Sequence, residues 1–331
     1  MGAAVLRSPW DGHPVKLTDA LFDCPKLPVI ARDLTTDGFY SLDDPTHSIV
    51  DPVRLEAYKR SSGGVKAAGA ELVRAADAFR SSGSRSAGKC VVDSLLGLAG
   101  QGSLTGKMSS SQAYYVQGWI AGTFAISYLK VRDAGLASPE QRQIIAGWLE
   151  SIGDATRRWY DAAGAKRGNS ARNNHFYWAG LELVAIGVAA DDRKDFEWGL
   201  GTYEAGVIQI GTDGTLPLEM ARGARALHYH LYALAPLVLL AEFGEANGLD
   251  LYAAHGGAIH RLVKVSIEGT AHPEFFVAAT GKSQEGSRTL SGDQIGWAPP
   301  YVRRFPNPEI ENYIKNARSL SSLYLGGLPP P

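Results

Sequence analysis

The segment that decides the fold reads RGARALHYHLYALAPLVLLAEF, from Arg222 to Phe243. Its apolar residues recur at the three- and four-residue spacing of an α-helix, which predicts a helix over about 220–247. At about 100° per residue, a stripe of leucine side chains runs along one side of this helix. A separate arc of about 80° holds four other residues: Arg222, Arg225, Tyr229 and Tyr232. The helix therefore has an apolar face for packing and a distinct face of arginine and tyrosine.

Similar helices are predicted along most of the chain. Helical spacing recurs over about 64–81, 87–100, 110–134, 139–163, 174–189, 192–209 and 251–268, with a weaker pair near the C-terminus. Short turns rich in Gly, Asp and Ser separate these segments, whereas residues 1–62 are irregular. Alternating β-branched runs are nearly absent, and Val263–Ile267 is the one serious strand candidate. Helices of similar length joined by short turns predict an all-α fold of stacked antiparallel hairpins.

The composition is that of an ordinary globular protein. The 331 residues are 45% hydrophobic and 20% charged, with a net charge of -1. This balance does not favour bulk attraction to nucleic acid or to an anionic membrane. We find no apolar run that approaches the roughly 20 residues of a membrane span, and the first residues lack a signal-peptide pattern. We expect either a cytoplasmic protein or a mature sequence without its leader.

The arginine and tyrosine face is predicted to bind a ligand. A solvated helix face usually mixes Glu, Lys and Gln, whereas Arg with Tyr is typical of recognition surfaces. No acidic residue lies between Met220 and Leu240 to balance the two arginines. Gly223 and Pro236 weaken the helix towards its two ends, so we expect its regular part to be short.

The segment NNHFYW, which ends at Trp178, forms a second polar group. Asn174, His175 and Trp178 share an arc of about 100° at the start of a predicted helix. Asn173 is the expected N-cap of that helix, and Tyr177 lies outside the arc and is expected in the core. Taken alone, His175 beside aromatic residues is more typical of a core histidine than of a catalytic one.

Neither a metal nor an organic cofactor is predicted. His228 and His230 are about 160° apart on a helix, whereas helical metal ligands need a spacing of three or four residues. No phosphate-binding, dinucleotide-binding or GxSxG motif is present. The two segments also lack paired carboxylates and a nucleophilic Ser or Cys. Amides, guanidinium groups, an imidazole and phenols are suited to removing a proton from a carbon beside a carboxylate.

At these residues the chain resembles the alginate lyases of polysaccharide lyase family 5. The family motif NNHxYW is matched by residues 173–178, and R-x-x-R-A-L-x-Y-H-x-Y-A-L is matched by residues 222–234. Asp195–Trp198 and Asp213–Pro217 also resemble family stretches. The resemblance is strong over about 165–250 and weaker from about 20 to 325.

The resemblance implies a fold and an activity. The fold is expected to be an incomplete (α/α) barrel, a toroid of antiparallel hairpins with a deep cleft, in one domain over 1–331 with an irregular lid segment at about 20–62. The activity is expected to be metal-independent β-elimination of 1,4-linked polyuronides, by default poly-mannuronate, with poly-glucuronate or hyaluronan as alternatives. The resemblance also implies export to the periplasm, and we expect a monomer whose partner is an acidic polysaccharide.

The resemblance also implies roles for individual residues. Asn174 and Arg222 are expected to neutralise the substrate carboxylate, and His175 and Tyr229 to transfer protons. Further substrate contacts are expected from the lid tyrosine and from five motif residues: Tyr40, Asn173, Trp178, Arg225, His228 and Tyr232. The spacing of Cys24 and Cys90 alone leaves free thiols and a disulfide open, and the resemblance implies the disulfide. The chain departs from the family at Phe39, Phe176 and Trp297–Tyr301.

Two other functions are compatible with parts of the pattern. An α/α-barrel glycoside hydrolase needs two carboxylates at the cleft, and Glu219 and Asp213 are the available pair. A non-catalytic polyuronide-binding protein needs the Arg and aromatic residues but not His175 together with Tyr229. The joint presence of these two residues favours an enzyme.

Overall fold

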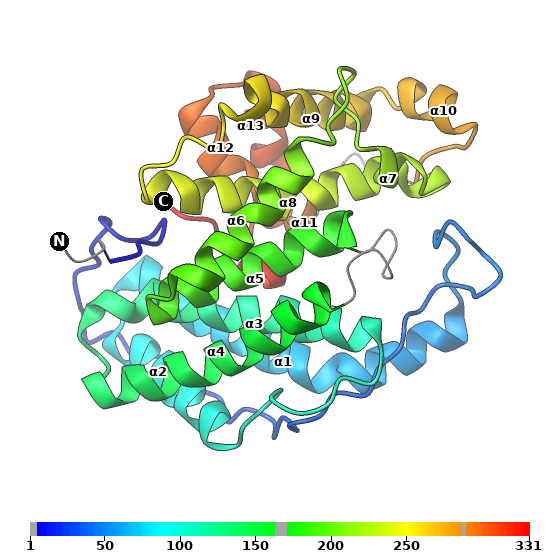
Figure 1. The fold of residues 1–331 in the computed structure, drawn as a ribbon. Helices are drawn as coiled ribbons and strands as arrows, with labels where there is room; N and C mark the ends of the chain where they lie inside the picture. Colours follow the sequence, from blue (N-terminus) through cyan, green and yellow to red (C-terminus); the bar gives the residue numbers. More distant parts are fainter. Residues whose placement is uncertain (1–4, 163–170, 286–288) are drawn as a thin grey trace.

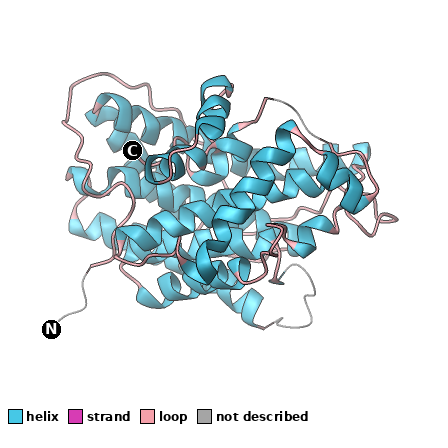
Figure 2. Cartoon of the chain, turned by 90° about the horizontal axis from the view of Figure 1, so that it is seen from above, coloured by secondary structure: helices cyan, strands magenta, loops and turns pink. Residues whose placement is uncertain are grey.

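The computed structural model describes residues 5–162, 171–285 and 289–331, and these residues form a helical assembly without named β-strands (Figures 1 and 2). The long helices are α1 (Pro52–Ser82), α2 (Arg85–Gly100), α3 (Ser111–Val131), α4 (Pro139–Asp161), α5 (Asn174–Ala190), α6 (Arg193–Val207), α8 (Ala226–Ala246) and α9 (Ala254–Ala271). The shorter helices are α7 (Pro217–Met220), α10 (Glu274–Thr280), α11 (Gly292–Ile295), α12 (Ala298–Arg304) and α13 (Pro308–Asn316). The all-α prediction is confirmed. The strand proposed at Val263–Ile267 is wrong, because these residues lie within α9.

Helix α5 is the centre of the fold and contacts α3, α4, α6 and α8 (Figure 1). It is apolar nearly all round, as expected of a helix enclosed by others. Its antiparallel contact with α6 depends on glycine, because a side chain at Gly180 would place its Cβ 1.7 Å from the Thr202 hydroxyl and 2.9 Å from the Gly199 carbonyl oxygen. The two backbones therefore approach closely, which fixes the start of α5 relative to the rest of the assembly.

Helix α1 begins earlier than the sequence pattern predicts. Irregular structure was expected up to residue 62, but α1 starts at Pro52, and the Asp51 side chain accepts hydrogen bonds from the amides of Val53 and Arg54. Asp51 is a regular N-cap and Pro52 occupies the first helical position, where its missing N–H costs nothing. Gly63 and Gly64 lower the helical signal of this stretch without breaking the helix. The extra turns bring residues 52–62 to the cavity described below.

The segment from Arg222 to Ala246 is helical, with a change of geometry at its start. Residues Gly223–Arg225 form a 3₁₀ turn, with Gly223 at a φ of 56°, and regular helix begins at Ala226. Gly223 does lie outside the regular helix, but the expectation of a short regular part is wrong, because α8 spans 21 residues and Pro236 lies inside it without ending it. By length and composition alone Gly223–Ala246 is apolar enough to cross a membrane, contrary to the sequence-based prediction, but 89% of its most apolar window is buried inside the fold.

The disulfide implied by the family resemblance is present. Cys24, in the irregular N-terminal segment, is bonded to Cys90 in α2, and their Cα atoms are 5.6 Å apart. This bond, together with isolated bridges from Thr18 to Ser84 and from Leu34 to Met108, holds the N-terminal segment along the helices that precede α4. The chain continues from Cys24 towards residues 37–50, the part of the irregular segment that covers the cavity described below. The bond therefore also limits where this covering part can begin.

We predict that reducing the disulfide lowers the free energy of unfolding by about 2–4 kcal/mol, because the bond closes a long loop in the unfolded chain. Urea denaturation of the wild type with and without reductant, and of a Cys24→Ala/Cys90→Ala variant, measures the effect. The reduced wild type and the variant should agree, and reductant should not alter the variant. An unchanged wild-type midpoint in reductant would contradict the prediction.

Candidate active site

A cavity of about 1030 Å³ lies between the lid, α1, α3, the start of α5 and the start of α8. Among its lining residues are eight of those predicted from the sequence: Tyr40, Asn173, His175, Arg222, Arg225, His228, Tyr229 and Tyr232. The two segments singled out in the sequence therefore meet at one cavity. The predicted arc of Arg222, Arg225, Tyr229 and Tyr232 faces that cavity, although its two arginines precede the regular part of α8.

Two predicted residues lie behind the cavity wall. The Asn174 side chain is fully buried, and its Nδ2 donates to both carboxylate oxygens of Glu219, at 2.9 and 3.0 Å. Trp178 is 2% exposed and packs under Tyr232, with ring centroids 5.0 Å apart. Asn173 does line the cavity and also caps α5, accepting a hydrogen bond from the amide of His175. Trp178 is therefore positioned to support Tyr232.

The lid, residues 37–50, is a short hairpin folded around one carboxylate. Its two arms meet at the bridge between Tyr40 and Val50. The buried Asp44 side chain accepts hydrogen bonds from the Thr46 hydroxyl at 2.6 Å and from the amides of Ser48 and Ile49 at 2.6 and 2.7 Å. These donors, the Thr46 hydroxyl above all, hold the pKa of Asp44 well below its ordinary value.

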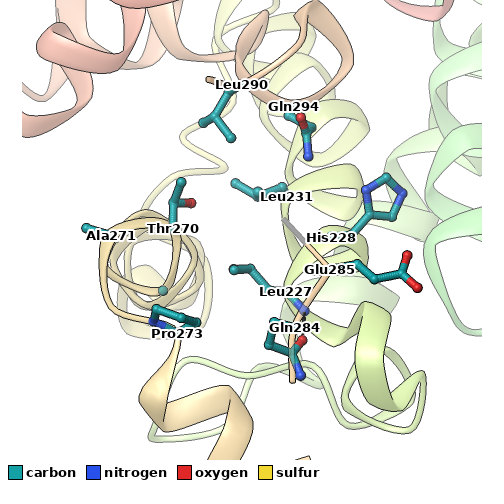
Figure 3. Close-up of a pocket in the computed structure, with 11 residues that line it drawn as sticks. Leu227, His228, Leu231, Thr270, Ala271, Pro273, Gln284, Glu285, Leu290 and Gln294 are labelled. Carbon is teal, nitrogen blue, oxygen red and sulfur yellow. Dashed lines mark hydrogen bonds between the residues drawn. The ribbon is translucent and has the colours of Figure 1, made fainter. Parts of the chain in front are cut away.

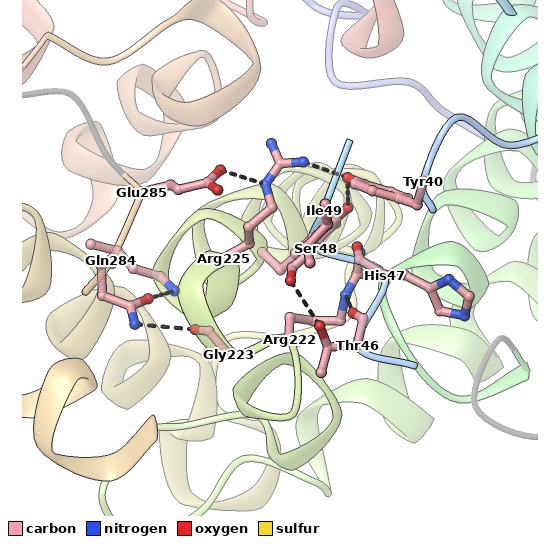
Figure 4. Close-up of polar contacts among 12 residues, drawn as sticks. Tyr40, Thr46, His47, Ser48, Ile49, Arg222, Gly223, Arg225, Gln284 and Glu285 are labelled. Atoms are coloured by element: carbon pink, nitrogen blue, oxygen red, sulfur yellow. Dashed lines mark hydrogen bonds and ion pairs between the residues drawn. The ribbon is translucent and has the colours of Figure 1, made fainter. Parts of the chain in front are cut away.

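Arg222 joins the lid to α8 (Figure 4). Its Nε donates to the Thr46 carbonyl oxygen at 2.8 Å, and its Nη2 donates to the His47 carbonyl oxygen. The guanidinium carbon lies 3.6 Å from the centroid of the Tyr229 ring, which is the distance of a cation–π contact. One side chain therefore holds the lid closed and covers one face of the Tyr229 ring.

A chain of short hydrogen bonds runs from Arg225 through the lid to Tyr229, and Figure 4 shows its first bond, from Arg225 to Tyr40. Arg225 Nη1 donates to the Tyr40 hydroxyl at 2.5 Å, and that hydroxyl is 2.5 Å from the Tyr229 hydroxyl. Burial raises the pKa of Tyr229 above its ordinary value, and the two arginines only partly oppose this effect. With the lid closed, burial outweighs the effect of the two arginines on this pKa. Tyr229 is therefore a neutral phenol at neutral pH.

His175 lies against aromatic residues of α3. Its ring stacks on Tyr115 with centroids 3.8 Å apart, and the Trp119 ring is 6.1 Å away, also between centroids. Burial lowers the pKa of His175 to about 3, and the charge on Arg222 acts in the same direction. Burial likewise lowers the pKa of His228 to about 4. Both imidazoles are therefore neutral near pH 7 and can accept a proton or donate one N–H.

His230 has a structural role. Its Nε2 accepts a hydrogen bond from the Leu216 amide at 2.9 Å, and its Nδ1 lies 2.8 Å from the Ala226 carbonyl oxygen. Since both ring nitrogens are engaged with the backbone, His230 does not form a metal-binding pair with His228. Within the described ranges, no three His, Cys, Asp or Glu side chains gather in a way that could hold a metal ion.

The carboxylates that a hydrolase would need are used elsewhere. Both oxygens of the fully buried Glu219 accept hydrogen bonds from Asn174, and Asp213 accepts from the amide and hydroxyl of Thr215. Neither Glu219 nor Asp213 lines the cavity. The structure therefore does not support the glycoside hydrolase hypothesis.

Sequence reasoning missed several cavity residues, most of them on α1 and α3. They are Arg54, Tyr58, Lys66, Gln112, Tyr115, Trp119, Asp293 and Tyr324. Tyr115 and Trp119 are four residues apart on α3, a spacing that indicates a shared helix face. The residues of α1 between 52 and 62 were missed because this stretch was predicted to be a loop.

A second, smaller cavity of about 210 Å³ lies on the far side of His228 (Figure 3). It shares His228 and Gln294 with the main cavity, and its remaining walls come mainly from α8, α9, Gln284, Glu285 and Leu290. Leu227 and Leu231 point into it from α8.

Comparison with known proteins identifies the class. The family model for alginate lyase matches residues 37–276. A polysaccharide lyase of Stenotrophomonas maltophilia (strain K279a) is 36% identical over 307 residues, covering 92% of this chain and 88% of the relative. The chain therefore belongs to the alginate lyase family and is a polysaccharide lyase.

Solved structures share the fold. Alginate lyase A1-III from Sphingomonas species A1 superposes with a TM-score of 0.79 at 24% identity, covering 98% of this chain and 95% of that chain. A variant of alginate lyase A1-III complexed with a tetrasaccharide superposes with a TM-score of 0.77 at 24% identity, covering 94% and 86% of the two chains. The predicted incomplete (α/α) barrel is thereby confirmed.

We predict that Asp44→Ala loosens the lid without unfolding the protein. Removing the carboxylate leaves the amides of Ser48 and Ile49 without their acceptor, so their hydrogen exchange should become about tenfold faster or more. Hydrogen exchange followed by mass spectrometry measures this effect. Asp43→Ala, at the exposed neighbouring position, is the matched control and should leave lid exchange unchanged. Equal exchange in wild type and Asp44→Ala would show that Asp44 does not organise the lid.

Proposed function

We propose that the protein cleaves 1,4-linked polyuronides by β-elimination, with poly-mannuronate as its preferred substrate, and leaves a C4=C5 double bond on the new non-reducing end. The observation that carries this proposal is the group of Arg222, Arg225, Tyr40 and Tyr229 at one cavity. It combines two cations with two phenols in hydrogen-bond contact. The tetrasaccharide complex of alginate lyase A1-III supports a sugar ligand for this fold.

The first requirement of the reaction is neutralisation of the substrate carboxylate. The proton on C5 is poorly acidic while the adjacent carboxylate keeps its charge, and a fixed cation disperses the enolate-like charge that develops. We assign this role to Arg222, assisted by Asn173. The Asn174 side chain is bonded to Glu219, so we assign it to holding the start of α5 against α7. The lid would then close over a substrate already held by Arg222.

The second requirement is proton transfer. We assign Tyr229 as the group that takes the C5 proton and returns a proton to the O4 leaving group. Tyr40 accepts a hydrogen bond from Arg225 and can still donate its own proton to Tyr229, which stabilises the phenolate as it forms. His175, a neutral imidazole beside the cavity, orients the sugar. It is the alternative base for a substrate whose C5 proton lies on the opposite face.

The stereochemistry of the sugar supports mannuronate as the substrate. In mannuronate the C5 proton and the O4 leaving group lie on the same face of the ring, so one residue can serve both. Glucuronate has the same arrangement at C4 and C5 and is the alternative. Glucuronate and mannuronate differ in the configuration of the C2 hydroxyl. The cavity walls beside Tyr232 and His228 would therefore decide which of the two sugars is accepted.

We further propose that the reaction needs no metal and that the protein acts in an oxidising compartment, the periplasm. The Cys24–Cys90 bond supports the oxidising compartment, because such bonds persist where thiols are oxidised.

Absorbance in the ultraviolet tests the reaction type, since β-elimination creates a conjugated double bond. A hydrolase would produce reducing ends without that absorbance, and a binding protein would produce neither. Equal rates with and without EDTA would agree with a metal-independent reaction.

We predict that Tyr229→Phe binds oligomannuronate but loses about 10²–10⁴-fold in kcat, because the proton-transfer group is removed while the ring remains. Product absorbance measures turnover, and calorimetry measures binding. Tyr177→Phe is the matched control, since Tyr177 is buried in the core and donates its hydroxyl proton to the Arg172 carbonyl oxygen. A Tyr229→Phe variant with nearly normal kcat would remove Tyr229 from the mechanism.

We predict that kcat/KM rises between pH 6 and pH 9. A base acts in its deprotonated form, and the pKa of Tyr229 is raised above its ordinary value by burial, so its phenolate fraction grows by up to about tenfold per pH unit across this range. Initial rates at low substrate concentration measure the profile. A profile that is flat or falls over this range would favour another base.

A further inference from the structure

Gln284 and Glu285 lie against the 3₁₀ turn that precedes α8 (Figure 4). Gln284 Nε2 donates to the Gly223 carbonyl oxygen at 3.1 Å, and Gln284 Oε1 accepts from the Leu227 amide at 3.0 Å. The backbone N–H of Glu285 donates to the Ala224 carbonyl oxygen at 2.7 Å. Two consecutive residues from a distant part of the sequence therefore fix the backbone of the turn that carries the arginines of the site.

Helix α8 takes its N-terminal cap from this external segment. Arg225 occupies the N-cap position, and its side chain makes no capping hydrogen bond. The first N–H groups of a helix have no acceptor within the helix, and a side-chain oxygen normally supplies one. Gln284 supplies that oxygen to Leu227 from 57 residues further along the chain. The Arg225 side chain is thereby left to serve the cavity.

The Glu285 side chain holds one edge of the Arg225 guanidinium. Glu285 Oε2 is 3.2 Å from Arg225 Nε, and on the other side Arg225 Nη1 donates to the Tyr40 hydroxyl at 2.5 Å (Figure 4). Arg225 Nε is buried and makes no hydrogen bond within the described part of the chain, so this ion pair offsets its burial. The guanidinium is therefore held between Glu285 and Tyr40.

The two arginines of the site differ in their partners. Among the ion pairs of residues 5–162, 171–285 and 289–331, Arg225 has one with Glu285 and Arg222 has none. Arg222 donates to lid carbonyl oxygens instead. A carboxylate beside Arg225 weakens its attraction for a second carboxylate, so Arg225 is suited to orienting a phenol and Arg222 to holding the substrate.

We propose that Glu285 and Gln284 are positioning residues of the lyase reaction. They hold Arg225 at Tyr40, so that the Tyr40 hydroxyl stays directed at Tyr229 and can donate to the phenolate as it forms. This inference rests on the proposed function and extends it to two residues that do not line the main cavity.

Turnover of poly-mannuronate tests the role of Glu285. Glu285→Gln removes the charge but keeps the size of the side chain, and because that side chain is 59% exposed the variant should fold. We expect kcat to fall about fivefold, the effect of losing one partly exposed ion pair, and KM to stay within about twofold. Glu285→Asp, which keeps the charge, should retain more of kcat. Ser283→Ala, at an exposed position of the same segment, is the matched control and should leave kcat unchanged.

Gln284 is tested in the same assay. Gln284→Ala removes the external cap of α8, so kcat should again fall about fivefold while KM stays within about twofold. Gln284→Glu keeps the acceptor for the Leu227 amide and should recover part of kcat. A Gln284→Ala variant with normal kcat would remove Gln284 from the proposal.

A double-mutant cycle separates positioning from a general loss of structure. In a Tyr40→Phe background the path from Arg225 to Tyr229 is already interrupted, so Glu285→Gln should lower kcat by less than about twofold. An equal fivefold loss in both backgrounds would overturn the inference, because Glu285 would then not act through Tyr40.

A spectroscopic readout does not depend on turnover. The Nε–H signal of Arg225 in nuclear magnetic resonance, assigned by its loss in Arg225→Lys, should shift or broaden in Glu285→Gln but not in Ser283→Ala. An unchanged signal, or an unchanged kcat with unsaturated product still formed, would overturn the inference and leave the lyase function intact. A changed signal, with no unsaturated product from any polyuronide in the wild type, would support the contact and overturn the proposed reaction.

Discussion

The active site depends on the buried contact between Asn174 and Glu219. The backbone N–H of Asn174 donates to Glu219 at 2.8 Å, and the side-chain amide donates to both carboxylate oxygens. Both residues are inaccessible to solvent, so neither group has water as an alternative partner. Asn174 is the first residue of α5, and Glu219 belongs to α7, which ends just before Arg222. The contact therefore holds the segment with Asn173 and His175 against the segment with Arg222.

Arg222 links this junction to the lid and to the reacting groups. It donates to two lid carbonyl oxygens and lies over the ring of Tyr229. Closure of the lid brings Tyr40 to Tyr229, and it uses the same guanidinium that we assign to the substrate carboxylate. Substrate binding and lid position are thereby coupled through one side chain.

The electrostatics of the cavity set the protonation states of its residues. Burial keeps His175 and His228 neutral by lowering the pKa of each, and it keeps Tyr229 protonated by raising its pKa. Arginines remain charged in almost any protein environment, so they supply the positive charge of the site. Neutral proton-transfer groups beside fixed cations suit a reaction in which negative charge develops only in the transition state.

The sequence by itself determined the helices and several of the faces that matter. Helical periodicity predicted most helix positions, and the arc of Arg222, Arg225, Tyr229 and Tyr232 does face the cavity. The motifs also indicated the family, and through it the Cys24–Cys90 bond. This success has a physical basis, because the angle between residues on one helix depends only on their spacing along the chain.

Only the tertiary structure decided which side chains reach the cavity and which lie behind it. Asn174 and Trp178 share a helix face with His175, but neighbouring helices cover them, and Trp178 supports Tyr232 from beneath. Arg54 was placed on a helix only by the observed start of α1 at Pro52, and Lys66, on a helix that was predicted, was placed at the cavity only by the packing of α1. Periodicity specifies the direction of a side chain from its own helix axis. The packing of other helices then determines whether that direction leads to solvent, to the core or to the substrate.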